Sequence, residues 1–382
     1  MSFWRLREDA LESNQDKSSE VLAAKPSGRW GQDTTTLLTL ALCLVSAATA
    51  WYLLREFATF LRPLLLAVFL CYIIVPIHLR LKQRVGSVVS MILIVGGSVA
   101  ILFLLAVLIY SSVIELTGDL PRLEQRATDI IQGGKEWFDK HAPAWLTSWA
   151  AELGGLGAPD AGASDPWMAK IREYALGIVN VAGDVLVAAV MVGFYLLFFL
   201  LEVSHFPLRL RKSFVGTQAD QILGVVGNIN AAIANYLRVK VQASLLLAVP
   251  VSMVLWLFGV KFAVLWGVLT FLCNFIPYVG SIVALSVPIL FAFLQVEPLW
   301  KPIAAGASLV TIHVMITYLV EPTLVGKGVG LSPLVILAAL AFWGQCWGLI
   351  GMFLAIPLTV MLKIVLENIA FTRPFAKMWG DE

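Results

Sequence analysis

Residues 262–294 of this sequence read FAVLWGVLTFLCNFIPYVGSIVALSVPILFAFL, and no charged side chain interrupts them. As one straight helix this stretch would be about 50 Å long, well beyond the roughly 30 Å hydrocarbon core of a bilayer. Near its middle Pro277 removes a backbone donor, and Gly280 tolerates a turn. These residues predict a break at membrane depth; the alternative is a proline kink within one tilted, over-long helix.

A break at this depth has a physical cost that limits where it can occur. Backbone groups freed inside a bilayer cost several kcal/mol each unless protein or water satisfies them. A broken helix is therefore expected in a protein interior or beside a wet cavity, which is how transporters build substrate sites. A second stretch, residues 333–366, has the same excess length and is interrupted by the run WGQCWG at 343–348, with Gly351 and Pro357 beyond it.

The two stretches resemble each other as a degenerate internal repeat. When the first stretch is aligned with the second at a shift of 71 positions, Gly280 aligns with Gly351 and Asn274 with Gln345. Glycines and amides therefore recur at both breaks. If each stretch is a re-entrant hairpin, the span between them reverses their orientation and the halves form an inverted repeat. If each crosses once, the protein has eight ordinary spans. The other identities pair Gly259, Leu269, Phe271 and Ala284 with Gly330, Leu340, Phe342 and Ala355.

The composition is that of a polytopic, all-α membrane protein with about eight hydrophobic segments. Of the 382 residues, 59% are hydrophobic and 14% charged, and the mean hydropathy is +0.85. A net charge of +2 without a basic run argues against nucleic acid as a partner. The sequence has no GxxxxGK[ST] phosphate loop and no catalytic constellation, so we expect no enzyme activity, no metal site and no cofactor.

Charge bias gives the expected topology. Arg80, Lys82 and Arg84 form a short basic loop, which predicts the cytoplasmic side and places both termini there. The insertion at 111–176 is richer in acids and carries Trp137, Trp145, Trp149 and Trp167; we expect it to lean on the membrane surface or on neighbours. The expected parts are a polar tail (1–36), three transmembrane helices (37–110), the extracytoplasmic insertion (111–176), a fourth transmembrane helix (177–201), a cytoplasmic amphipathic segment (202–242), a transport core (243–366) and a cytoplasmic tail (367–382).

Three motifs carry a resemblance to a known family. They are NFIPYVGSIVA, then EPTLVGKGVGLSPLVIL, and a Gly-rich run that ends in GMFLAIPL. With them, residues 37–370 resemble the autoinducer-2 exporter family of bacterial inner-membrane permeases. The family is associated with export of the quorum-sensing signal autoinducer-2 or, in some members, with sodium/proton antiport, so the resemblance implies transport and leaves the substrate open. The motif positions are Asn274, Ile276, Pro277, Tyr278, Gly280, Glu321, Pro322, Gly326, Gly348, Gly351, Ala355 and Pro357.

The breaks supply the candidate solute pathway. Asn274 and Gln345 offer neutral donors and acceptors, which suit a small polar solute better than a strongly charged one. The alternative for both amides is to cap the broken backbone without contacting substrate. The predicted pathway residues are Asn274, Pro277, Tyr278, Gly280, Gln345, Gly348 and Gly351.

Ionisable side chains within spans supply the candidates for a coupling ion. Asp184 lies four residues after Asn180 on one helix face, unless the span begins nearer residue 185. His313, Thr317 and Glu321 are spaced i, i+4 and i+8 and share a face, the material of a proton relay. The alternative is a packing histidine, with Glu321 holding the loop that follows it.

These observations predict a secondary-active or facilitative transporter that exports a small polar solute such as autoinducer-2. The two broken segments would meet near the midplane and form the pathway. One alternative is a sodium(cation)/proton antiporter; another is a membrane scaffold that binds a partner through the 111–176 insertion and transports nothing. The expected partners are the small solute or a monovalent cation, the lipid bilayer and, by analogy with the family, further copies in a homo-oligomer.

Overall fold

A computed structural model describes residues 29–143, 187–202, 205–214, 217–325 and 330–380. The chain divides into two units, Met1–Phe57 and Ala58–Glu382, and each is described by itself. Several predictions lie outside the described residues. They concern the polar tail before residue 29, the insertion beyond residue 143 with Trp145, Trp149 and Trp167, the start of the fourth transmembrane helix with Asp184, and Gly326 of the second motif.

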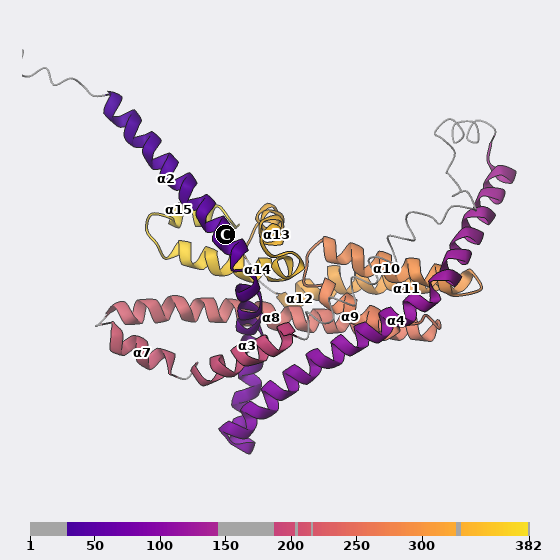
Figure 1. The fold of residues 1–382 in the computed structure, drawn as a ribbon, viewed down its shortest axis with the longest axis horizontal. Helices are drawn as coiled ribbons and strands as arrows, with labels where there is room; N and C mark the ends of the chain where they lie inside the picture. The colour runs from indigo at the N-terminus through magenta and orange to yellow at the C-terminus, as the bar shows by residue number, and fades with distance from the viewer. Residues whose placement is uncertain (1–28, 144–186, 203–204, 215–216, 326–329, 381–382) are drawn as a thin grey trace, which may run out of the picture. The chain divides into compact units, whose positions relative to one another are not determined.

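The described residues are helical and contain no strand, which confirms the all-α, polytopic expectation. Six helices among them are long and apolar enough to cross a membrane, and a bent pair, Val187–Glu202 with Phe206–Ser213, is a seventh candidate. The helices are α2 (Arg29–Glu56), α3 (Ala58–Val85), α4 (Ser87–His141), Val187–Glu202, α7 (Phe206–Ser213), α8 (Thr217–Leu257), α9 (Ala263–Cys273), α10 (Val279–Gln295), α11 (Trp300–Met315), the π-helix η1 (Ile316–Val320), α12 (Glu321–Val325), α13 (Pro333–Trp347), α14 (Leu349–Glu367) and α15 (Arg373–Lys377) (Figure 1).

The first unit contains a single described helix, α2. Its candidate span, Leu37–Glu56, buries none of its apolar window within the protein. Leu37, Leu38 and Leu44 are each more than half exposed. Because such side chains are stable in hydrocarbon and not in water, this helix is suited to cross a membrane by its length and composition.

In the second unit, α3, α4 and the helix Val187–Glu202 pack through one apolar cluster. Ala67 and Ile74 of α3 pack against Leu196 of the helix Val187–Glu202, and side chains of α4 pack around them. The turn between α3 and α4 is fixed by Ser90, whose buried hydroxyl lies 3.0 Å from His78 Nδ1. These contacts give the unit a helical scaffold beside its broken segments.

Helix α4 continues far past the expected end of the third span. Its 55 residues extend for about 80 Å, more than twice the hydrocarbon thickness. Beyond the span it contacts the connections around the first broken segment: Asp119 pairs with Lys261 at 2.6 Å and Arg126 with Glu297 at 2.6 Å. Leu123 joins the apolar core beside them. The described part of the insertion therefore leans on neighbouring elements.

The first broken segment is a helical hairpin formed by α9 and α10. Trp266 and Phe291 bring the two helices together, with ring centroids 5.2 Å apart. At its base the backbone N–H of Lys261 donates to Gln295 Oε1 at 2.8 Å. The chain reverses over residues 274–278, where Tyr278 has a φ of 62°. The predicted break is confirmed, and its form is a hairpin instead of a kinked span.

The second broken segment repeats this design with α13 and α14. The chain reverses at Gly348, and Trp343 Nε1 donates to Thr359 Oγ1 across the hairpin at 3.2 Å. At the base, Lys363 Nζ donates to the carbonyl oxygen of Gly330 at 2.6 Å. Gly330, with a φ of 64°, precedes this hairpin as Gly259, with a φ of 75°, precedes the first one.

A glycine allows the helices to approach closely near each turn. A Cβ atom on Gly280 would overlap the backbone carbonyl of Cys273, and one on Gly351 would overlap that of Trp343. Each contact joins the second helix of a hairpin to the end of the first. The two glycines matched in the sequence repeat therefore have equivalent structural roles.

The hairpins have their bases at opposite ends of the segment α11–η1–α12. The first base precedes Trp300, where this segment begins, and the second follows Val325, where it ends. The turn of the first hairpin packs against the second hairpin: Phe275 stacks on Phe353 with centroids 4.5 Å apart, and Ile276 packs with Leu340. This is the arrangement expected of an inverted repeat with re-entrant segments.

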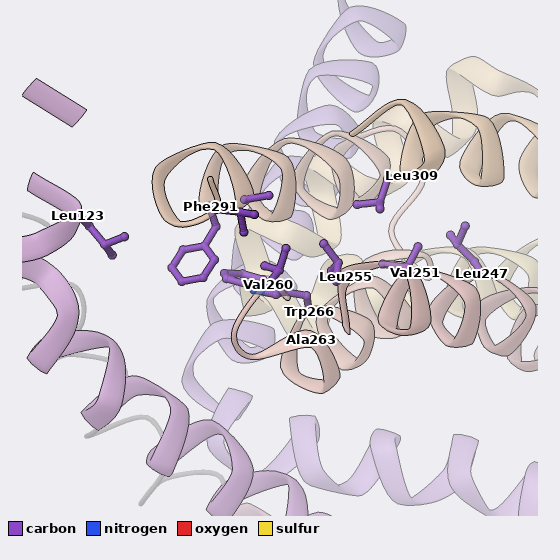
Figure 2. Packing of buried hydrophobic residues seen from close by; sticks show 11 residues of the cluster. Leu123, Leu247, Val251, Leu255, Val260, Ala263, Trp266, Phe291 and Leu309 are labelled. Atoms are coloured by element: carbon purple, nitrogen blue, oxygen red, sulfur yellow. The ribbon is translucent and has the colours of Figure 1, made fainter. Parts of the chain in front are cut away.

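An apolar core holds the first hairpin against α8 and α11 (Figure 2). Leu247, Val251 and Leu255 of α8 lie on one face and are almost fully buried. Across from them are Leu309 of α11 and the ring of Phe291. Burying one such side chain contributes about 1.5–3 kcal/mol, so this core fixes the position of the hairpin relative to both helices.

Candidate functional site

A pocket of about 680 Å³ lies where the turn of the first hairpin faces α8, α14 and the segment α11–η1–α12. Its lining combines apolar side chains with hydroxyl, amide, imidazole and charged groups. Pockets of this size and mixed lining are typical of sites for small molecules. The lining residues are Ala232, Asn235, Tyr236, Val239, Lys240, Asn274, Pro277, Tyr278, Ser281, Ile282, His313, Thr317, Tyr318, Glu321, Ile356 and Val360.

The centre of the polar lining is an ion pair between helices. Lys240 Nζ of α8 donates to Glu321 Oε1 of α12 at 2.5 Å. The two side chains are 11% and 18% exposed, so most of their surface is removed from solvent. A pair buried to this extent is costly to form, and breaking it leaves an uncompensated charge. Each charge therefore depends on the other.

Two hydroxyl groups beside this pair have no hydrogen-bond partner among the residues that the structure describes. Tyr236 lies one helical turn before Lys240, and its buried OH is unpaired; Thr317 lies one turn before Glu321, and its buried Oγ1 is unpaired as well. In contrast, the hydroxyls of Ser308 and Thr311 on α11, the helix that leads into η1, donate to backbone carbonyl groups one turn earlier. A buried polar group without a partner is unfavourable, and both residues line the pocket, so their hydroxyls are candidate partners for a ligand that enters it.

The π-helix η1 shapes this wall of the pocket. It spans Ile316–Val320, directly before Glu321. A short π-helical turn inside an α-helix changes the register of the side chains that follow it and is frequent at functional sites. Here His313, Thr317 and Glu321, which the sequence predicts on one face, all line the pocket, and His313 is 6% exposed.

Asn274 anchors the turn of the first hairpin. Its Nδ2 donates to Ser244 Oγ of α8 at 2.9 Å, and the side chain is buried. The amide group thus bonds a neighbouring helix, while the residue also lines the pocket. Pro277 and Tyr278 of the same turn line the pocket too, and Gly280 is buried immediately behind them.

The second hairpin contributes its long helix, not its turn. Gln345 and Gly348 are exposed and Gly351 is buried; all three are absent from the pocket lining. From this hairpin the lining takes Ile356 and Val360 of α14. The structure therefore brings together the pathway residues of the first break and the polar groups of α11–α12, and it separates them from the polar residues of the second break.

Lys240 and Tyr236 are among the lining residues that the sequence interpretation missed. The sequence places them in a cytoplasmic amphipathic segment that ends at residue 242, whereas α8 is one continuous helix from Thr217 to Leu257. A signal was present: residues 239–258 contain no glycine and continue the apolar pattern without a turn. An acid such as Glu321 inside a span also requires a partner, and Lys240, three residues before the apolar segment that begins at residue 243, is one basic candidate.

A multi-pass helical protein with two opposed hairpins and a polar pocket between its helices has the architecture of a membrane transporter. The chain belongs to the AI-2E transporter family: the family described as "AI-2E family transporter" matches residues 40–371. This agrees with the motifs at Asn274 and Glu321. The family membership and the pocket together define a transport protein.

Curated relatives carry transport names. A "Putative transport protein" of Haemophilus influenzae is 30% identical over 84% of this chain and 89% of its own length. The "AI-2 transport protein TqsA" of Escherichia coli K12 is 26% identical over 86% of this chain and 91% of its own length. A "Putative transport protein" of Borreliella burgdorferi is 33% identical over 50% of this chain, and the match spans about half of that relative, 54%.

Proposed function

We propose that this chain is a secondary-active or facilitative transporter that exports a small polar solute such as autoinducer-2. The observation that carries the proposal is the pocket itself. It offers the unpaired hydroxyls of Tyr236 and Thr317 beside an internally neutralised pair, Lys240 and Glu321. A solute rich in hydroxyl groups would satisfy such groups without introducing charge.

The proposed location is the bacterial inner membrane, with both termini in the cytoplasm. Transport would require the turn of the first hairpin to change position at the pocket, because Asn274, Pro277 and Tyr278 of this turn are part of the lining. A homo-oligomer remains part of the proposal by analogy with the family. If the turn moves during transport, the hydrogen bond between Asn274 and Ser244 is one of the contacts that would differ between the states of the transport cycle.

A second candidate is cation/proton antiport, favoured by the presence of Glu321 and His313 in one pocket. Flux into proteoliposomes separates the two candidates. We expect the purified protein to move autoinducer-2, and Asn274→Ala to slow this movement by about tenfold, since a lost buried hydrogen bond costs about 1–1.5 kcal/mol. Sodium or proton exchange driven by imposed gradients, and abolished in Glu321→Gln, would instead establish the antiporter.

Thr317 provides a test of the ligand role of the pocket hydroxyls. Because its Oγ1 has no hydrogen-bond partner in the described part of the chain, Thr317→Val should leave the midpoint of thermal unfolding unchanged or slightly higher, while solute flux falls several-fold. The matched control is Thr359→Val. The Thr359 hydroxyl donates to the carbonyl oxygen of Ala355 and accepts from Trp343, so this variant should lose about 1–2 kcal/mol of stability. Wild-type flux in Thr317→Val would exclude its hydroxyl from the solute site.

A further inference from the structure

We propose that Lys240 is a specificity-determining residue, an internal counter-ion that keeps the transport pocket electrically neutral and so excludes free ions from it. The inference rests on the proposed function, in which the pocket carries a neutral polar solute. It assigns a role to a residue that belongs to none of the three family motifs. It also explains why a carboxylate can line a solute pathway without making that pathway a cation site.

The charges of the lining residues support this role. Among the described residues around the pocket, Lys240 and Glu321 carry the formal charges, and His313 with the three tyrosines Tyr236, Tyr278 and Tyr318 completes the titratable groups. With a neutral imidazole the lining has no net charge. Lys240 comes from α8 and Glu321 from α12, so the neutrality is created by the packing of two separate elements.

The geometry makes the pair a barrier to ions of either sign. A sodium ion that binds Glu321 beside the ammonium group is repelled by that charge, and one that takes its place must displace it from Glu321 Oε1, 2.5 Å away. That exchange leaves Lys240 charged and unpaired in a largely buried position, which is strongly unfavourable. An anion that displaces Glu321 from Lys240 leaves the Glu321 carboxylate charged and unpaired in a largely buried position. The pocket therefore opposes both kinds of ion.

A neutral hydroxyl group meets no such barrier. An ammonium group has three donors and a carboxylate has several acceptor positions, so a solute can hydrogen-bond to both residues while they stay paired. Tyr236 and Thr317, each one turn from a member of the pair, add two further hydroxyls with unused bonding capacity. The same four side chains thus reject ions and accept a hydroxylated solute.

Substitutions that remove one charge should give the pocket a selectivity of predictable sign. The variants Lys240→Met, Glu321→Gln and the double variant are reconstituted in proteoliposomes, and fluxes of sodium, chloride and the neutral polyol erythritol are measured at pH 7 and pH 9. We expect Lys240→Met to gain sodium flux and Glu321→Gln to gain chloride flux, each by about tenfold or more over wild type, and the double variant to gain neither. Arg238→Met is the matched control, because Arg238 is an exposed cation on the same helix outside the pocket.

The reversal of sign distinguishes this role from a structural one. A pair that only holds α8 to α12 would give the same leak in both single variants, without discrimination between sodium and chloride, and that result would overturn the proposal. So would sodium flux in the wild type equal to that in Lys240→Met, or no ion gain in either single variant at either pH. Lys240→Gln repeats the cation measurement if Lys240→Met folds poorly, and Glu321→Gln tests the same idea with Lys240 intact.

The outcomes also separate this inference from the function on which it rests. Failure of the wild type to move autoinducer-2 would reject the proposed solute but would not alter the ion selectivity of the variants. Conversely, a wild type that exports the solute while its single variants show no charge selectivity would retain the transport function and remove Lys240 from its specificity.

Discussion

Replacing Gly280 with alanine is expected to abolish solute flux while the protein still inserts into the membrane. The added Cβ would overlap the carbonyl group of Cys273, which is backbone and cannot rotate away. The first hairpin would have to open near its turn, at a cost of about 3 kcal/mol. Opening would displace Pro277 and Tyr278, which line the pocket from that turn. The measurements are solute flux in proteoliposomes and the midpoint of thermal unfolding.

A glycine of α8 supplies the matched control. Gly227 is helical and exposed, and a Cβ there would meet no atom within 4 Å. Gly227→Ala should therefore keep wild-type flux and gain up to about 1 kcal/mol from helix propensity. Gly351→Ala should damage the second hairpin as Gly280→Ala damages the first, because its Cβ would overlap the backbone of Trp343. Wild-type flux in Gly280→Ala would show that the close approach is dispensable.

The positions of both breaks could be predicted from the sequence because their causes are local. A proline followed closely by a glycine, as at Pro277 and Gly280, or a glycine-containing run such as WGQCWG, favours a break in an over-long apolar stretch, whereas Pro288 and Pro357 lie inside continuous helices. Whether the chain then crosses or turns back depends on long-range packing. The two helices of each segment are held together as a hairpin by contacts between them, Phe291 with Trp266 in the first and Thr359 with Trp343 in the second. Nothing in the local sequence specifies these pairs.

The candidate site was predictable in part for a related reason. His313 and Glu321 are conspicuous as ionisable residues within an apolar segment. Lys240 is not conspicuous, since it follows several basic residues and fits the positive-inside pattern of a cytoplasmic segment. Its role depends on α8 passing Glu321, which is 81 positions away in the chain. A contact of that separation cannot be inferred from spacing within one element.

The internal repeat predicts more symmetry than the pocket has. Asn274 and Gln345 are matched in sequence, yet Asn274 is buried against Ser244 while Gln345 is exposed. The difference arises from the neighbours of each turn. The first turn is covered by α8 and by the second hairpin: Ile276 packs into a cluster of the second hairpin, and Phe275 stacks on its Phe353. The side-chain amide of Asn274 is therefore enclosed. Repeat symmetry in the backbone therefore does not transfer a binding role from one amide to the other.

The second large effect is expected on stability when the buried ion pair is broken. Lys240→Met should lower the free energy of unfolding by about 3–5 kcal/mol, because Glu321 is left buried and without its counter-ion. The matched control is Arg209→Met. Arg209 also pairs with its acid, Glu202, at 2.5 Å, but those side chains are 69% and 47% exposed. Its loss should cost at most about 1 kcal/mol.

The double variant Lys240→Met with Glu321→Gln decides what the pair does for the fold. If the cost of the single variant comes from an orphaned charge, the double variant should recover most of the lost stability, since no ion remains to be desolvated. Salt provides an independent measure: added salt should weaken the exposed Arg209 pair and leave the Lys240 pair almost unaffected. A double variant as unstable as Lys240→Met would show that the pair itself stabilises the packing of α8 against α12. In that case neutrality of the pocket would be a consequence of the fold and not the reason for the lysine.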